Sequence, residues 1–309
     1  MVKNQYKYEM IRAMIQAKGV IVMDYLYVML ATVLLAVEFA LSKKYQALEG
    51  VSAIVGLRFN ALSGFLSAVV VWGFSGFRLE WSVFSFVLAL GLALCGISYS
   101  MIGFRILKKG SLALYSTFLM SGGMLLPYLF GIVFLHEKLT LLRMFGMLFV
   151  LAAVILSNFS KQKTDRKQLF LCFAVFVLNG LVSIISKCHQ IGSAYGAISS
   201  SGFVMYSGIG KCVCSLLAML LYHKRGSPPA TMDTLSFSVT AGAAAVGAAS
   251  YFLQLIGAKN LPASVLYPMV TGGSILFSTI TGKAFFREAI SPRQRFSIVL
   301  CIIGTLLFL

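Results

Sequence analysis

The sequence predicts an all-α integral membrane protein whose ten transmembrane helices form two inverted five-helix repeats. Hydrophobic residues make up 59% of the 309-residue chain and charged residues only 11%. That composition leaves too little polar surface to cover a soluble domain. The apolar residues also gather in long runs, and a helix needs roughly 20 apolar residues to cross a hydrocarbon core about 30 Å thick.

Short polar breaks divide the chain into ten apolar runs. We expect spans at residues 25–41, 51–74, 81–103, 111–135, 141–156, 169–186, 197–222, 237–257, 263–286 and 296–309. The run at 141–156 approaches full length only by including the next three residues. The predicted organisation is a basic N-terminal tail at 1–23, a first repeat at 24–158, a linker at 159–168 and a second repeat at 169–309. The tail carries four basic residues, and we expect it to be a helix on the membrane surface.

An internal repeat relates the two halves. Sliding the stretch 110–158 forward by 151 positions aligns Gly122, Leu125, Gly131, Phe134 and Glu137 with the identical residues Gly273, Leu276, Gly282, Phe285 and Glu288. At the front of each half, Ser42, Lys43 and Gln46 recur as Ser186, Lys187 and Gln190. Because five spans is an odd number, the second half enters the membrane from the opposite side. Many transporters are built from such inverted repeats, with the substrate site where the repeats meet.

Charge and cysteine usage exclude several other classes. The net charge of +17 comes from Lys and Arg that lie mostly in short loops, where anionic lipid head groups explain them better than nucleic acid does. Five of the six cysteines lie inside apolar runs and Cys188 ends one, so we expect buried free thiols. Cys212 and Cys214 have no His or carboxylate close by in sequence, and we predict no metal and no cofactor.

The chain resembles the ten-helix EamA-type branch of the drug/metabolite transporter superfamily. The resemblance rests on the Gly-rich fourth and ninth spans with their exit segments, 134–140 and 285–291, on the lead-ins 109–111 and 259–263, and on the Leu-Arg-Phe at 57–59. His136 stands where the family usually has a small residue such as Gly, and the seventh span has no Arg to match Arg58. The resemblance implies metabolite transport by alternating access. It leaves the substrate open among amino acids, sugars, nucleotide sugars, organic phosphates and cationic drugs.

Three ionisable residues stand out within the predicted spans, namely Glu38, Arg58 and Lys211. A charge that faces lipid costs at least about 2.5 to 3.5 kcal/mol, so each should face a cavity or a partner. In one interpretation, Arg58 and Lys211 face a cavity and attract a carboxylate or phosphate. In the other, Glu38 pairs with Arg58 and Lys211 extends to the membrane interface.

Glu38 also invites comparison with the small multidrug members of the same superfamily, in which a first-span Glu exchanges protons for drug cations. It is therefore either a proton carrier or part of a structural ion pair. We expect Glu137 and Glu288 to fasten helix ends rather than bind substrate. The other polar residues that we expect in a substrate site are Tyr99, Tyr115, Asn179, Tyr206, Tyr251, Gln254 and Tyr267. Each of them is equally able to satisfy a neighbouring helix instead.

The sequence thus favours a secondary active transporter of a small metabolite with an anionic group. The alternatives are a cation exporter that uses Glu38 and a lipid-translocating membrane subunit. An enzyme is not expected, because neither HExxH nor GxSxG occurs. The expected partners are the lipid bilayer, the substrate and a proton or other coupling ion, in a monomer or homodimer in a bacterial inner membrane.

Two features of the sequence predict opposite orientations of the protein in the membrane. Outside the tail, 15 Lys and Arg follow odd-numbered spans and 5 follow even-numbered ones. The positive-inside rule therefore places both termini outside the cell, whereas resemblance to the family places them in the cytoplasm.

Overall fold

A computed structural model of the chain describes residues 2–107, 112–157, 166–223, 232–287 and 290–308. Helices are the only regular secondary structure in these residues. The ten α-helices are α1 (Val2–Glu49), α2 (Ala53–Phe74), α3 (Val83–Leu107), α4 (Leu112–Val133), α5 (Leu141–Ser157), α6 (Arg166–Ile191), α7 (Ser200–His223), α8 (Thr234–Asn260), α9 (Ala263–Phe286) and α10 (Pro292–Leu306). A short 3-10 helix, η1 (Ser193–Tyr195), precedes α7.

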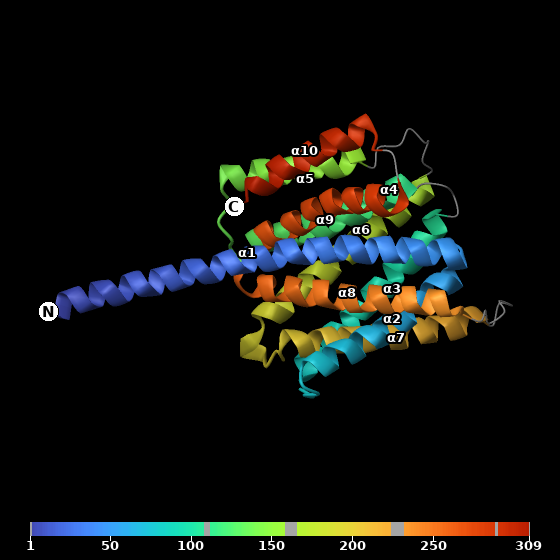
Figure 1. Cartoon of the computed structure of the whole chain (residues 1–309), viewed down its shortest axis with the longest axis horizontal. Helices are drawn as coiled ribbons and strands as arrows, with labels where there is room; N and C mark the ends of the chain where they lie inside the picture. Colours follow the sequence, from blue (N-terminus) through green and yellow to red (C-terminus); the bar gives the residue numbers. More distant parts are fainter. Residues whose placement is uncertain (1, 108–111, 158–165, 224–231, 288–289, 309) are drawn as a thin grey trace.

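Eight helices in the described part of the chain are long and apolar enough to cross a membrane, namely α1 to α4 and α6 to α9. Their lengths and compositions are those of a multi-pass integral membrane protein. Helices α5 and α10 occupy the places of the two remaining predicted spans, but they have only 17 and 15 residues. They lie side by side at one edge of the bundle (Figure 1).

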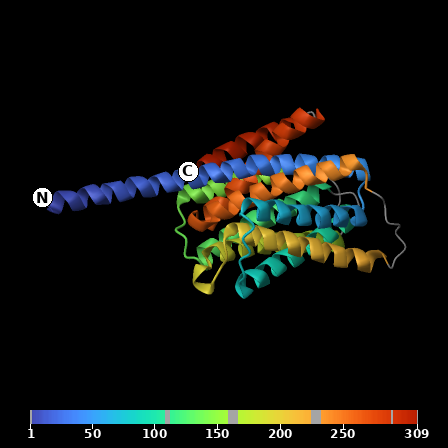
Figure 2. The ribbon, with the colours of Figure 1, turned by 60° about the horizontal axis from the view of Figure 1, so that its bottom comes forward.

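The N-terminal tail differs from the predicted separate segment. It continues into the first span as one helix of 48 residues, about 72 Å long at 1.5 Å per residue. Its first part projects beyond the bundle, and the C-terminus lies at the same end (Figures 1 and 2). We call this end of the bundle the terminal end. It contains the C-terminal ends of α6 and α8 and the first turns of α7 and α9.

Most of the larger helix contacts recur when each helix is replaced by the one five places along the chain, although the α6–α8 and α5–α9 contacts have no comparable counterpart. Helix α1 packs against α8 and α9, and α6 correspondingly packs against α3 and α4. Helix α2 contacts α8 as α7 contacts α3, and the pairs α2–α7, α4–α9 and α5–α10 map onto themselves. The backbone follows the same register, because His136 and Arg287, 151 positions apart, both have left-handed conformations, with φ of 52° and 54°.

Glycines bring two of these pairs together, α2 with α7 and α5 with α10. A Cβ on Gly208 of α7 would lie 2.7 Å from the carbonyl oxygen of Gly64 in α2, and a Cβ on Gly64 would lie 2.7 Å from that of Gly208. Gly146 of α5 and Gly304 of α10 have the same relation at 2.9 Å. Only residues without a Cβ allow backbones to approach this closely in a membrane bundle.

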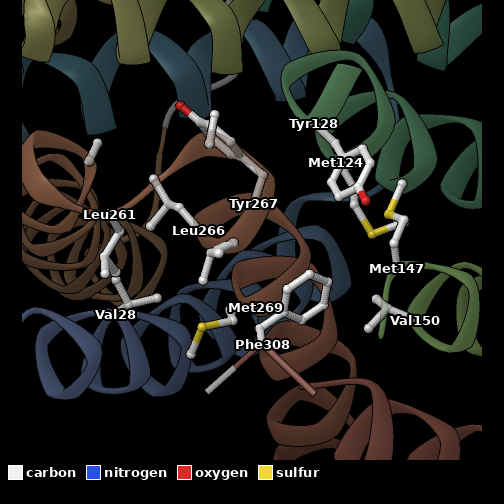
Figure 3. Packing of buried hydrophobic residues seen from close by; sticks show 13 residues of the cluster. Val28, Met124, Tyr128, Met147, Val150, Leu261, Leu266, Tyr267, Met269 and Phe308 are labelled. Carbon is white, nitrogen blue, oxygen red and sulfur yellow. The ribbon is translucent and has the colours of Figure 1, made fainter. Parts of the chain in front are cut away.

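A buried apolar cluster joins both halves near the terminal end. It contains Val28 of α1, Met124 of α4 and Met147 of α5, together with Leu261 and Leu266 around the start of α9 (Figure 3). All six cysteines are free thiols; Cys172, Cys214 and Cys301 are buried as expected, whereas Cys95, Cys188 and Cys212 are half-buried.

Replacing Gly208 by Ala should destabilise the protein by about 1 to 3 kcal/mol, because the new methyl group overlaps the backbone of α2. The matched control is Gly73→Ala, since a Cβ on Gly73 has no atom within 4 Å. Thermal unfolding in detergent should show a lower midpoint for the first variant only. Equal midpoints for both variants would contradict the proposed close crossing.

Candidate substrate cavity

Eight helices enclose a cavity of about 470 Å³ in the centre of the bundle. Helices α1 to α4 and α6 to α9 all contribute lining residues, whereas α5 and α10 contribute none among the residues described. Besides its apolar surface, the wall carries uncharged polar side chains from six helices: Asn60, Ser63, Ser67, Tyr99, Ser100, Asn179, Ser183, Ser186, Ser207, Ser250, Tyr251, Gln254, Tyr267, Thr271 and Ser274. The cavity volume falls within the range of about 300 to 1,000 Å³ that is typical of small-molecule sites.

Two opposite charges face this cavity, Glu38 from α1 and Lys211 from α7. Lys211 Nζ donates to Ser63 Oγ at 3.1 Å, which uses one of its three N–H donors. The two charged groups attract each other across the cavity without a direct ion pair. They therefore leave room for a ligand or water between them.

The Glu38 carboxylate makes no hydrogen bond within the described structure, although it lies inside the membrane bundle. It rests on the backbone of Gly247, where a Cβ would lie 2.6 Å from the Glu38 Cδ. Glycine at this position of α8 therefore makes the space that the carboxylate occupies. A carboxylate placed in this way is available to a proton or to a cationic group.

Seven of the ten sequence-predicted site residues line the cavity: Glu38, Tyr99, Asn179, Lys211, Tyr251, Gln254 and Tyr267. Arg58 lies outside it, at the end of the bundle opposite the termini, and forms an ion pair with Glu49. Its Nε also donates to the Tyr45 hydroxyl at 3.3 Å. The alternative pairing of Glu38 with Arg58 is therefore wrong, because the end of α1 brings Glu49 to the start of α2 instead.

Two predicted tyrosines also lie off the cavity wall. The Tyr206 hydroxyl donates to the carbonyl oxygen of Glu80 in the α2–α3 connection. Tyr115 packs against α3, where a Cβ on Gly103 would lie 2.8 Å from the tyrosine ring. Both tyrosines face neighbouring protein because of the rotation of their helices, which the residue type alone does not reveal.

Asn179, Ser183 and Tyr267 combine a place on the wall with bonds between helices. Pro127 lacks the N–H that would bind the carbonyl of Gly123, four residues earlier in α4. The Ser183 hydroxyl of α6 donates to that carbonyl at 3.1 Å, and Asn179 Nδ2 donates to Leu119 O at 2.7 Å. The Tyr267 hydroxyl donates to the Ser183 carbonyl, which links α9 to the same place.

The remaining predicted residues differ in how many of their polar groups are engaged. Tyr251 shares a hydrogen bond with Ser186 at 2.8 Å, and Gln254 Nε2 donates to Ser250 Oγ at 3.2 Å. The Tyr99 hydroxyl has no hydrogen-bond partner among the residues described, and Tyr99 lies close enough to Glu38 to feel its charge. Tyr99, Glu38 and the two other N–H groups of Lys211 are thus the groups most available to a ligand.

Sequence reasoning missed most of the small polar residues of the wall. Asn60, Ser63 and Ser67 stand three and four residues apart in α2, and Tyr267, Thr271 and Ser274 are spaced four and three apart in α9. Residues with this spacing share one helical face. A polar stripe at helical period within an apolar span is the signal that identifies them.

Comparisons with known proteins inform the fold alone. The chain matches no family model and no curated protein. Twenty-eight chains of solved structures match it. One of them, described only as "Crystal structure of protein", has a TM-score of 0.72 at 18% sequence identity, over 91% of this chain and 94% of its own. The chain thus shares this helical fold with a protein of very different sequence.

Replacing Ser183 by Ala should destabilise the protein by about 0.6 to 1.7 kcal/mol, the range measured for hydrogen bonds between membrane helices. This loss of stability should be smaller in a Pro127→Ala background, because the restored N–H at position 127 binds the Gly123 carbonyl. A double-mutant cycle on thermal unfolding measures this coupling. Ser238→Ala is the control, since that hydroxyl binds only its own helix. Additive effects of the two substitutions would refute the coupling.

Proposed function

We propose that the protein is a secondary active transporter of a small metabolite that works by alternating access, in a bacterial inner membrane. The observation that carries this proposal is the central cavity with Glu38 and Lys211 on its wall. Intramembrane ionisable residues are costly unless they serve a site or a pathway. Because these two side chains form no ion pair, a purely structural role does not explain them. The resemblance to the EamA-type branch agrees with this function.

An inverted repeat supports the same mechanism. Most of the larger helix contacts recur when the two sets of five helices are exchanged, and left-handed residues recur in the register of the repeat. We take α5 and α10 to cross the membrane together with the eight longer helices, so that each half has five crossings and the two halves have opposite orientations. Two halves of this kind enclose a site between them and expose it to either side by rocking.

The charges of the cavity indicate the class of substrate. Lys211 is a donor for a carboxylate or phosphate, and Glu38 accepts a cationic group or a proton. We therefore propose a substrate with an anionic group, such as an amino acid or a nucleotide sugar. The serines and tyrosines of the wall supply hydrogen bonds to the rest of it.

A cation exporter is the second candidate, and the Glu38 carboxylate favours it, because it makes no hydrogen bond in the described structure and lies on the same cavity wall as Tyr99. In this mechanism a proton and a drug cation compete for Glu38. The two candidates differ in the residue that they need, because anion binding depends on Lys211 whereas cation exchange depends on Glu38.

Replacing Lys211 by Ala should reduce transport of an anionic or zwitterionic substrate at least about tenfold, because a charge-assisted hydrogen bond contributes about 1.5 to 3 kcal/mol. The measurement is uptake into proteoliposomes, with amino acids, nucleotide sugars and quaternary amines compared with and without a pH gradient. Lys259→Ala, at an exposed lysine outside the cavity, is the control. Undiminished transport by a folded Lys211→Ala variant would remove Lys211 from the site.

Replacing Glu38 by Gln should separate the two candidates, because the amide has nearly the same shape but cannot carry a proton. For metabolite transport we expect substrate exchange to continue while accumulation driven by a pH gradient is lost. For cation export, both exchange and accumulation of quaternary amines should be lost. Unchanged gradient-driven accumulation would exclude Glu38 as the proton carrier.

A further inference from the structure

Three carboxylates at the terminal end cross from the first half of the chain, α1 to α5, to the second half, α6 to α10. Glu137, after α4, accepts hydrogen bonds from the backbone N–H groups of Ala263 and Ser264 at 2.6 and 2.8 Å. Glu80, after α2, accepts from the backbone N–H of Ser199 at 2.6 Å. Asp24 of α1 accepts from Asn260 Nδ2 at 2.9 Å. We call these three acids the terminal latch.

Glu137 binds two donors that have no partner within α9. The first N–H groups of a helix point out of its end, and the helix dipole favours negative charge there. This result confirms the prediction that Glu137 fastens a helix end. Glu288, for which the same role is predicted, lies outside the described residues. The Glu137 carboxylate lies against Gly131, where a Cβ would be 2.6 Å from Oε2. The Gly131 and Glu137 of the repeated motif thus form one structural unit.

The turn that Glu137 holds is unusually buried for a connection at the end of a bundle. Leu261, Ala263, Ser264 and Leu266 are at most 2% exposed. Figure 3 shows Leu261 and Leu266 packed beside Val28 of α1. Loops normally lie on the surface, so this turn is a plug between the two halves rather than a free connection.

The plug borders the cavity at the terminal end. Ala258 and Leu266, on either side of the turn, line the cavity wall. Lys187, which is 4% exposed, donates from Nζ to the carbonyls of Ala258 and Leu261 at 2.7 Å each. It also attracts Glu137 electrostatically. The turn that the latch holds thus forms part of the cavity wall on its terminal side.

No equivalent bonds are described at the other end of the bundle. Among the side chains described there, Glu49 pairs with Arg58 of its own half and Asp233 caps its own helix at Thr234. Lys43, the counterpart of Lys187 in the repeat, is exposed, whereas Lys187 is buried. The carboxylate bonds between the halves that the structure describes are thus confined to one end.

We infer that Glu137, with Glu80 and Asp24, holds the cavity closed toward the terminal end, and that these bonds break when the transporter opens there. The inference rests on the proposed function, because only a protein with two access states needs such a latch. Glu137 is a positioning residue that acts through the α8–α9 turn and does not touch the substrate. Its loss should shift the protein toward the state that is open at the terminal end.

The test is the accessibility of residue 258 to a membrane-impermeant maleimide applied separately to each side of proteoliposomes. An Ala258→Cys variant places a thiol on the cavity wall beside the latched turn, and mass spectrometry of its peptide gives the labelling rate despite the native cysteines. From the terminal side, Glu137→Gln should raise this rate about tenfold, as expected for the loss of charge-assisted hydrogen bonds. Glu137→Asp should restore protection at least in part.

Asp233→Asn is the matched control, because it removes a carboxylate from a helix N-terminus away from the latch. It should leave the labelling of residue 258 unchanged. Asp24→Asn provides a milder opening of the latch if Glu137→Gln does not fold. The inference is overturned if both latch variants label at the unaltered rate, or if Asp233→Asn raises the rate equally. Labelling needs no substrate, so a failure of the latch remains distinct from a failure of the proposed transport.

Discussion

The need to hold Glu38 and Lys211 inside a membrane bundle is the constraint on which the rest of the structure depends. A charge in contact with lipid costs at least about 2.5 to 3.5 kcal/mol, so both groups face inward, into a central cavity whose largely apolar wall also carries polar side chains. A hollow centre removes the side-chain packing that would otherwise hold the helices together. Close backbone crossings at Gly64 with Gly208, and at Gly146 with Gly304, replace part of that packing.

The sequence predicted the charged part of the cavity well, because a charge in the middle of an apolar run has few places to go. The same argument was less informative for Arg58, which lies near the start of its helix. There the partner comes from the preceding helix, and only the geometry of the α1–α2 turn shows that it is Glu49. A span's interior thus constrains a charge more strongly than its ends do.

Uncharged polar residues were harder to predict for a different reason. A serine in a membrane helix can donate to a carbonyl three or four residues earlier in its own helix, as Ser207 does to Val204. Its presence therefore says nothing about a cavity until its helical face is known. For the same reason, the sequence did not distinguish Tyr251, which lies on the cavity wall, from Tyr206, which binds the α2–α3 connection.

Ser183 connects the cavity wall to the two proline-containing helices, α4 and α9. Its hydroxyl satisfies the carbonyl that Pro127 leaves free in α4, and its own carbonyl accepts from Tyr267 in α9. One residue of α6 therefore connects both proline-containing helices, one from each half. Because α9 begins at the turn that Glu137 holds, a bend in α4 and a release of that turn act on the same set of hydrogen bonds. On the proposed mechanism, movement at the terminal end would therefore change the shape of the cavity.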